Sequence, residues 1–227
     1  AVTITAGASE TGLTLAGTFN GQTLTGITEN GGGTYTGTYT VVEGDSNIAD
    51  AGSVTTSITL TDAAGNASTA LTAIVLSGES IDANSPVAIS SVAIPNTSMN
   101  VGDVVTVTIT ASEQGLTLSG TPTIGGFTVS SLTDNSDNTY TAQFTVTEGG
   151  TDVAANASIP VSIILADAAG NTTPTFTTAI TQAGDDIDAN TPTIASTSVA
   201  NGTYNVGDTV AVTITAGASE TGLTLAG

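Results

Sequence analysis

The feature that most constrains the fold is a repeat within the chain. Residues 1–17 recur letter for letter at residues 211–227, and the segment Ile81–Pro86 returns in nearly identical form as Ile187–Pro192. The two short segments lie 106 residues apart, which is within the size range of one compact domain. The sequence therefore predicts similar units in tandem, each followed by a short acidic linker.

The repeat divides the chain into three predicted parts. Residues 1–82 are expected to form a unit that lacks its first strand, residues 83–187 a complete unit, and residues 188–227 the opening strands of a third. The exact repeat has an offset of 210 residues, which covers two units. We therefore expect the repeating element of a longer array to be a pair of related but non-identical domains.

Strand signals within residues 83–187 are those of an all-β sandwich. Val105, Val107 and Ile109 alternate with threonines, which is typical of a strand with one buried and one solvated face. Clusters of Gly, Asn and Asp separate seven such segments, expected near residues 87–94, 104–110, 116 onward, 127–132, 140–146, 159–165 and 175–181. A unit of this length and strand number predicts tandem seven-stranded immunoglobulin-like β-sandwiches joined by short acidic linkers.

Inward-facing side chains can be predicted for the fifth of these strands. In the complete unit they are Tyr140, Ala142, Phe144 and Val146. The corresponding residues in the first unit are Tyr35, Gly37, Tyr39 and Val41.

Composition excludes most catalytic chemistry. The chain has no Lys, Arg, His or Cys, carries 20 carboxylates and has a formal net charge of -20. It therefore has no Ser-His-Asp triad, thiol nucleophile or zinc site with nitrogen or sulfur ligands, and only a pair of carboxylates remains as a conceivable acid and base. We expect no enzyme. We also expect no nucleic-acid binding, because phosphates would be repelled.

The same composition favours a folded chain over a disordered one. Disordered segments combine high net charge with few apolar residues, whereas here 39% of residues are hydrophobic and the mean hydropathy is +0.28. No apolar run reaches the 18 or so residues of a membrane-spanning helix, so no membrane span is expected in this segment.

Acidic and amide side chains are predicted to converge on the linkers, because alternate loops of a sandwich lie at the same end. Hard cations such as Ca²⁺ prefer oxygen ligands of this kind. At the first linker the predicted ligands are Glu43, Asp45, Asp50, Asp82, Asn84, Glu113, Asp167 and Asn171. At the second they are Asp103, Glu148, Asp152, Asp188, Asn190 and Glu220, with Asp185 and Asp186 close by. Glu10, Asp62 and Asn66 would serve the linker before the first unit.

The alternative is that these residues form turns on a solvated surface. We favour this interpretation for Glu29, Asp134 and Asp137, and the calcium interpretation for the linker sets, because the latter converge from separate loops. Bound calcium would also relieve the repulsion between carboxylates that no Lys or Arg can offset.

The motif order resembles a known family. A Gly-Asp turn, Ser-Glu before Gly-Leu-Thr-Leu, Asp-Ala-Ala-Gly-Asn, and Ile-Asp-Ala-Asn-Ser/Thr-Pro together resemble the tandem bacterial immunoglobulin-like, or cadherin-like, repeats of giant surface adhesins and extracellular filament proteins. The resemblance implies an extracellular or cell-surface stalk, filament or fibre that calcium stiffens. Its partners would be neighbouring repeats of the same chain or identical chains in a fibre.

Two further hypotheses remain open. One is an adhesive module that recognises a surface ligand, a glycan or a protein, through its loops. The other concerns assembly: strands from neighbouring copies would complete each other's sandwiches, with residues 188–227 supplying what precedes residue 1. A continuous chain of repeats is the simpler explanation of the partial units.

Overall fold

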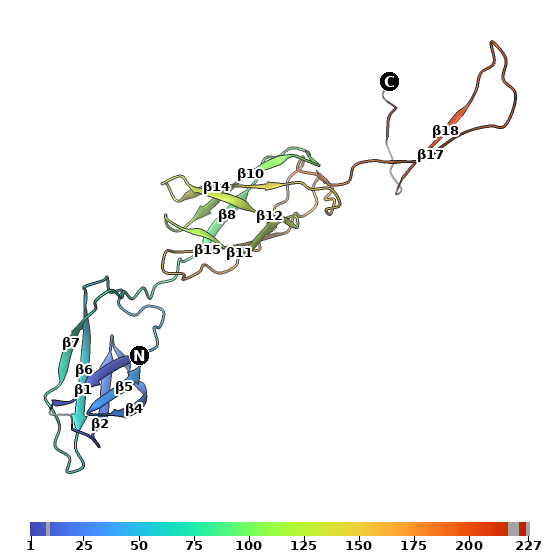
Figure 1. Cartoon of the computed structure of the whole chain (residues 1–227). Helices are drawn as coiled ribbons and strands as arrows, with labels where there is room; N and C mark the ends of the chain where they lie inside the picture. Colours follow the sequence, from blue (N-terminus) through green and yellow to red (C-terminus); the bar gives the residue numbers. More distant parts are fainter. Residues whose placement is uncertain (8–9, 218–222, 226–227) are drawn as a thin grey trace. The chain divides into compact units, whose positions relative to one another are not determined.

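The computed structural model describes residues 1–7, 10–217 and 223–225 (Figure 1). Two compact units are present: residues 1–87 with 165–173, and residues 88–164 with 174–227. All named elements are β-strands, which confirms the all-β prediction. Within the described ranges, no helix is long and apolar enough to cross a membrane. The domain boundaries at residues 82 and 187 stay a prediction.

The second unit contains two facing sheets. One sheet has the order β13-β14-β10-β8 and the other the order β12-β11-β15. The strands of the first are β8 (Ile89–Ala93), β10 (Val104–Ala111), β13 (Ser130–Asp134) and β14 (Thr139–Thr145). Those of the second are β11 (Thr117–Ile124), β12 (Phe127–Thr128) and β15 (Val161–Ala166). The rings of Phe127 and Phe144 stack with centroids 5.9 Å apart and join the two sheets.

The core of this unit follows from period-two alternation. Val105, Val107 and Ile109 are buried while Thr106 and Thr108 are exposed, as predicted. On the neighbouring strand β14 the predicted inward residues Tyr140, Ala142 and Phe144, and Val146 just beyond it, are likewise buried. The order of strands in the two sheets is that of immunoglobulin sandwiches, with the first, second, fourth and fifth strands opposite the third and sixth.

Two predicted strands differ from the structure. The segment 175–181 forms no strand and pairs through single bridges, Ile180 with Ile159 and Phe176 with Ile163, because only these two residues of the segment turn inward. The predicted strand 127–132 divides into β12 and β13, which belong to different sheets. Val129 separates the two strands, and within β13 the pairing with β14 shifts register between Ser130 and Thr133. Ser131, inside this irregularity, has a φ of 59° in the left-handed region.

The first unit also has two sheets, with the orders β1-β5-β4 and β3-β2-β6-β7. Its strands are β1 (Val2–Thr5), β2 (Thr14–Phe19), β3 (Gln22–Thr23), β4 (Thr25–Gly31), β5 (Thr34–Thr38), β6 (Ser53–Thr61) and β7 (Leu71–Val75). The buried core consists of Ala6, Leu15, Phe19, Leu24, Tyr35, Val54 and Ile58. Val41 was predicted to face inward, but it follows the end of β5 and is 49% exposed.

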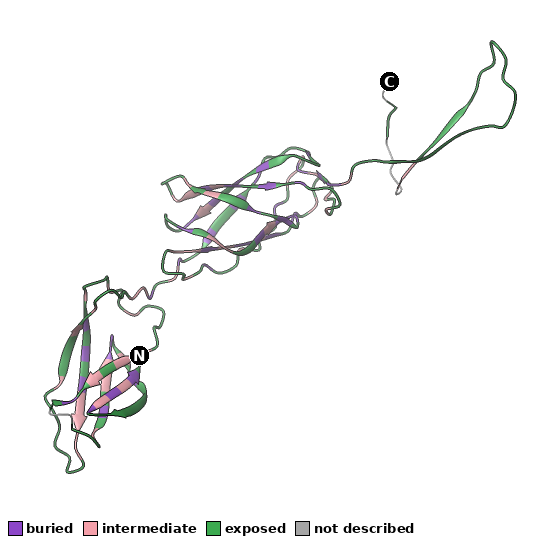
Figure 2. Ribbon diagram, viewed as in Figure 1, coloured by how far each residue is buried: buried purple, intermediate pink, exposed green. Residues whose placement is uncertain are grey.

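Residues beyond the second linker form a hairpin of β17 (Ile194–Val199) and β18 (Val212–Ala216). All six residues of β17 are exposed, as are four of the five of β18. Figure 2 shows this hairpin in green, whereas the strands of the second unit's sandwich carry buried residues in purple. The hairpin is therefore held by the paired backbones of its two strands, with a register shift between Ile194 and Ser196, while most of its side chains are exposed.

Candidate functional site

The first linker is docked on a loop of its own unit. Ile81 and Ile48 exchange two backbone hydrogen bonds of 2.8 Å, and Gly44 donates to the carbonyl of Ala83 at 2.8 Å. Asn47 Oδ1 accepts from the amide of Ala83 at 2.7 Å and from Asn84 Nδ2 at 2.8 Å. The Glu43 carboxylate accepts from the amide of Ser85 at 3.1 Å. We call this set the first linker clamp.

The second linker makes the same hydrogen bonds at the corresponding positions, although some of the residues differ. Ile187 and Val153 exchange backbone hydrogen bonds of 2.8 and 2.9 Å, and Gly149 donates to the carbonyl of Ala189. The remaining bonds come from side chains. Asp152 Oδ1 accepts from the Ala189 amide and from Asn190 Nδ2, both at 2.8 Å. Glu148 accepts from the Thr191 amide at 3.1 Å and also from its hydroxyl. This set is the second linker clamp.

Each linker has an alanine, Ala83 or Ala189, at a buried position where only a small side chain fits. Ala83 is 4% exposed and Ala189 is fully buried. A Cβ added at Gly150 would lie 3.0 Å from Ala189 Cβ and 2.6 Å from Phe127 Cζ, so a larger residue at either place would not fit. The proline that follows lacks an N–H, so the linker cannot continue as a paired strand.

Sequence reasoning placed Glu43, Asp82 and Asn84 at the first linker and Glu148, Asp152, Asp188 and Asn190 at the second, and the structure brings these residues together within each unit. It missed Asn47. Alignment of Glu43-x-x-x-Asn47 with Glu148-x-x-x-Asp152 would have found it, because both residues present a side-chain oxygen to the linker alanine. Asp50 instead accepts from the amides of Ala51 and Gly78.

Several other predicted ligands use their oxygens in local turns. Asp62 Oδ1 accepts from the amides of Ala64 and Asn66, and its Oδ2 accepts from Asn66 Nδ2 at 2.8 Å. Asp167 makes the same three bonds with Ala169 and Asn171. Asn171 Nδ2 also donates to the carbonyl of Asp82 at 3.3 Å. These bonds close the Asp-Ala-Ala-Gly-Asn loops.

Hydrogen bonds to the charged form of the carboxyl group lower the pKa of three predicted ligands, Asp45, Asp62 and Asp167. The Gln22 side chain, the Val42 amide and the Tyr39 hydroxyl lower the pKa of Asp45. Bonds from Asn66, first through its side chain, lower the pKa of Asp62. At Asp167 desolvation raises the pKa, but the bonds from Asn171 and its neighbours outweigh it, so the net shift is downward.

The remaining predicted ligands have separate surroundings. Asp103 Oδ2 accepts from the Asn100 amide at 2.8 Å. Glu10 and Glu113 contribute backbone carbonyls, which accept from the hydroxyls of the buried Tyr35 and Tyr140. Glu220 lies outside the described residues. Asp134 and Asp137 accept backbone N–H groups two residues on, as the turn interpretation predicted for them. Glu29 instead lies in β4 and accepts the amide of Gly12, so the turn interpretation is wrong for this residue.

One carboxylate near the second linker is buried without full compensation. Asp185 is 1% exposed, and within the described part of the chain its Oδ1 has no hydrogen-bond partner, while Oδ2 accepts a long bond of 3.4 Å from Gln182. Its neighbour Asp186 accepts from the Ser98 hydroxyl at 2.6 Å. Among the described residues, no group of three or more carboxylates is arranged to hold a metal ion.

Comparisons with known proteins leave the chain without an assigned family. No known protein family and no curated protein matches it. It is similar to a solved structure described as the Bacteroides ovatus mixed-linkage glucan utilization locus SGBP-B in complex with mixed-linkage heptasaccharide. The TM-score is 0.26 and the identity 16%, over 78% of this chain and 40% of that one. The chain thus spans less than half of that structure.

Proposed function

We propose that this chain is a structural segment of a long extracellular tandem-repeat protein, in which each folded unit carries its outgoing linker as a fixed part of itself. The observation that supports this most directly is the recurrence of the linker clamp. Both clamps use the same backbone pairs and the same two side-chain positions, although only one of those positions, Glu43 and Glu148, keeps the same residue.

The clamp restricts the linker in a way that suits a spacer. A free hexapeptide rotates about two backbone dihedrals per residue, whereas residues 81–85 and 187–191 are bonded to the loop before them. Backbone rotation is then left only to the residues that follow the bonded segment. The first of these, Pro86 or Pro192, has a fixed φ. In such a spacer a pulling force acts on the folded units, because the linkers between them cannot first extend as free chain.

The composition supports an extracellular setting for such a spacer. A chain without Lys or Arg has no site for trypsin-like proteases. It also has no lysine for isopeptide crosslinks, so its mechanical strength depends on packing, hydrogen bonds and bound ions. Repeat proteins gain length by adding similar units, which agrees with the exact recurrence of residues 1–17.

Calcium at the linkers is part of this proposal. In the second unit Asp152, Asp186 and Asp188 line one shallow pocket of about 240 Å³. Among the described residues these carboxylates are not arranged as a metal site, so calcium would have to draw their oxygens together. Isothermal calorimetry with CaCl₂ should give saturable binding, and EDTA should then lower the melting temperature. Absence of both effects would remove calcium from the proposal and leave the hydrogen-bonded clamps to act alone.

Amide hydrogen exchange tests the spacer function itself. In a folded spacer the amides of Ala83, Ser85, Ala189 and Thr191 should exchange as slowly as the strands of their own units, because each donates to a clamp acceptor. Stretching single molecules should then show unfolding of whole units with no earlier extension of the linkers. Fast exchange at these amides and an early soft extension would contradict the proposal.

The alternative function, a glycan-binding module, has a direct test. Mixed-linkage heptasaccharide is the ligand named for SGBP-B and is therefore a suitable probe. Of the four Tyr and four Phe residues, all of which the structure describes, only Tyr204 is exposed, so a sugar would find a single aromatic ring to stack on. We expect no heat of binding, and saturable binding would favour the adhesive module.

A further inference from the structure

One buried carboxylate of the second unit has no positive partner. Asp185 is 1% exposed, and among the described residues its Oδ1 accepts no hydrogen bond. A buried charge is normally paired with an opposite charge or coordinates a metal ion. The chain has no Lys, Arg or His, so none of its side chains can supply the positive charge that Asp185 lacks. A cation from solution can supply it.

Neutral oxygen atoms lie close to this carboxylate. Gln182 Nε2 donates to Asp185 Oδ2 at 3.4 Å and also to the carbonyl of Ile94 at 3.3 Å, which brings these two oxygens to the same side-chain amide. Asn96 Oδ1 accepts from the amide of Gly184, the residue before Asp185, at 2.7 Å. A carbonyl oxygen has two lone pairs, so the oxygens of Ile94 and Asn96 can each bind a further partner.

Gly184 leaves open space beside the oxygens of Asn96. A Cβ at this position would lie 3.4 Å from the backbone oxygen and 3.4 Å from the Oδ1 of Asn96. These two oxygens therefore face a glycine rather than a side chain. Asn96 and its neighbours Pro95 and Thr97 are exposed, so the solvent and its ions reach the loop that carries these oxygens.

The kinds of ligand atom around Asp185 favour calcium. Softer metals would need Cys or His, which the chain lacks. Ca²⁺ binds backbone and Asn carbonyl oxygens together with carboxylates and tolerates irregular geometry, whereas Mg²⁺ demands a near-ideal octahedron and keeps several waters. Among the described residues no three carboxylates gather around a metal position, so this site has few charged ligands. A dissociation constant of about 10⁻⁴–10⁻³ M, as in extracellular calcium-binding modules, is therefore expected.

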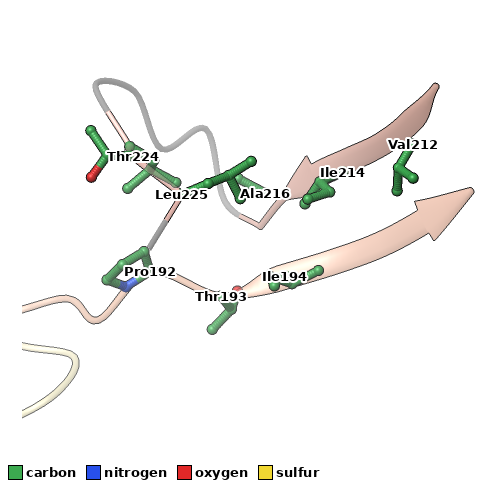
Figure 3. A pocket seen from close by; sticks show the side chains of 9 residues that line it. Pro192, Thr193, Ile194, Val212, Ile214, Ala216, Thr224 and Leu225 are labelled. Carbon is green, nitrogen blue, oxygen red and sulfur yellow. The ribbon is translucent and has the colours of Figure 1, made fainter. Parts of the chain in front are cut away.

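A larger pocket of the second unit has different chemistry. Figure 3 shows Ile194, Ile214 and Leu225 among the side chains that line it, and its volume is about 470 Å³. Its lining residues include no carboxylate and no amide side chain. It is therefore no candidate for a metal ion, whereas an ion at Asp185 would compensate a buried charge.

We propose that the second unit holds a calcium ion at Asp185, with Asn96 and the carbonyl of Ile94 as further ligands. Asp185 does not line the linker pocket described above, so this is a separate site. It does not rest on the calcium proposed for that pocket.

The ion joins the loop that follows β8 to the segment that precedes the second linker. In the same region β9 (Met99–Asn100) pairs in parallel with β16 (Ile187–Asp188), and Met99 donates to the carbonyl of Asp186 at 2.9 Å. Calcium at Asp185 thus reinforces the pairing that anchors the outgoing linker to its unit.

NMR of the ¹⁵N-labelled chain tests where the ion binds. Titration with CaCl₂ should shift the amide of Gly184 and the side-chain amide of Asn96 along one saturable curve. Asp185→Asn, which keeps the shape of the side chain, should abolish these shifts. Asp152→Asn removes a carboxylate from the linker pocket, keeps the kind of acceptor that Asn47 provides in the first clamp, and should preserve them.

Three results would overturn the proposal: no shift in the unaltered chain, shifts that persist in Asp185→Asn, or equal shifts with MgCl₂ at the same concentration. Shifts that disappear in Asp152→Asn and persist in Asp185→Asn would place the ion in the linker pocket instead. That outcome would support the linker calcium and reject the site at Asp185.

Thermal melting provides a second test of the charge compensation. In EDTA the Asp185→Asn chain should melt above the unaltered chain, because no ion compensates the buried carboxylate. CaCl₂ should then raise the melting temperature of the unaltered chain by more than that of the variant. Equal gains in the two chains would overturn the proposal.

A substitution in the exposed loop tests the role of Asn96. Asn96→Asp adds a charged ligand, keeps an oxygen for the amide of Gly184, and should lower the dissociation constant for calcium severalfold. Thr97→Asp adds the same charge at the next residue and is the matched control, which should leave the constant nearly unchanged. Equal constants for these two variants would overturn the assignment of Asn96 as a ligand.

Discussion

Residues 2–6 and 212–216 have the same sequence and different surroundings. Both form strands, but β1 packs against the core of the first unit, while β18 pairs with β17 and has four of its five residues exposed. Ile4 is half-buried, Ile214 is 40% exposed, and their counterpart Ile109 in the second unit is fully buried. Alternating Val, Thr and Ile is thus sufficient for an extended conformation, but burial depends on what the rest of the chain brings to the strand.

The largest expected effect comes from the same substitution at these three isoleucines. Ile109→Ala should destabilise its unit by about 2–5 kcal/mol, because it leaves a cavity in a closed core. Ile4→Ala should have a smaller effect, and Ile214→Ala should stay within about 0.5 kcal/mol, as is typical of exposed positions. Urea unfolding followed by tyrosine fluorescence measures all three. Equal losses at Ile4 and Ile214 would mean that the hairpin has a core in solution.

The buried tyrosines come next. Tyr140 donates to the carbonyl of Glu113 and accepts from the amide of Leu116, and Tyr35 makes the matching bonds with Glu10 and Leu13. Phenylalanine at position 140 leaves the amide of the buried Leu116 unpaired, so we expect a loss of about 1–3 kcal/mol in the second unit. Phenylalanine at position 35 exposes the amide of the half-buried Leu13, so the loss in the first unit should be smaller. Tyr204→Phe, at the exposed tyrosine, is the control. Calorimetric melting should show a lower transition only for the two buried sites.

Asp185 and its counterpart Glu79 sharpen the comparison of the two units. Asp185 is buried with one unpaired oxygen, whereas Glu79 is exposed and accepts from the amide of Ser77. Asp185→Asn removes a buried charge and should stabilise the second unit by about 1 kcal/mol, because burying an uncompensated ion is unfavourable. Glu79→Gln should leave the melting temperature unchanged. A loss of stability in Asp185→Asn would show that the carboxylate has a partner in solution.

The two linker clamps can be compared at one position. The acceptor for the amide of the linker alanine is Asn47 in the first clamp and the charged Asp152 in the second. Alanine at either position removes the acceptor for the linker alanine, and we expect a loss of about 1 kcal/mol per clamp, with the charged Asp152 the more sensitive. Exchange of the amides of Ala83 and Ala189 should accelerate in the respective variant. Glu29→Ala removes a carboxylate outside both clamps and should affect neither amide.

The smallest expected effect is the dependence of the melting temperature on pH. Asp45 and Asp62 have lowered pKa values in the folded chain, so the stability they contribute is present above their unfolded pKa of about 3.9 and is lost as pH falls through the folded pKa. The melting temperature should therefore decline below about pH 4. Asp45→Asn and Asp62→Asn should each decline less steeply. An unchanged slope in both would contradict the role of their hydrogen bonds.

Much of the candidate site could be read from residue types and spacing. Glu148 and Asp152 were predicted to lie at the second linker beside Asp188 and Asn190, and both accept hydrogen bonds from it; their role as calcium ligands stays a prediction. Their partners could not be predicted, since the same oxygens suit a metal ion or a backbone N–H. Here the amides of Ala189 and Thr191 are within hydrogen-bonding distance, and only the folded loop decides that.

Sequence by itself determined the all-β class and the inward face of β10 and β14, because alternation and turn residues act on the local backbone. Tertiary structure alone decided that segment 175–181 pairs only at Phe176 and Ile180, that Val41 faces solvent, and that a sequence packed on a core in β1 is exposed in β18. Burial is a property of two surfaces in contact. A strand specifies one of them, and the other comes from residues far away in the chain.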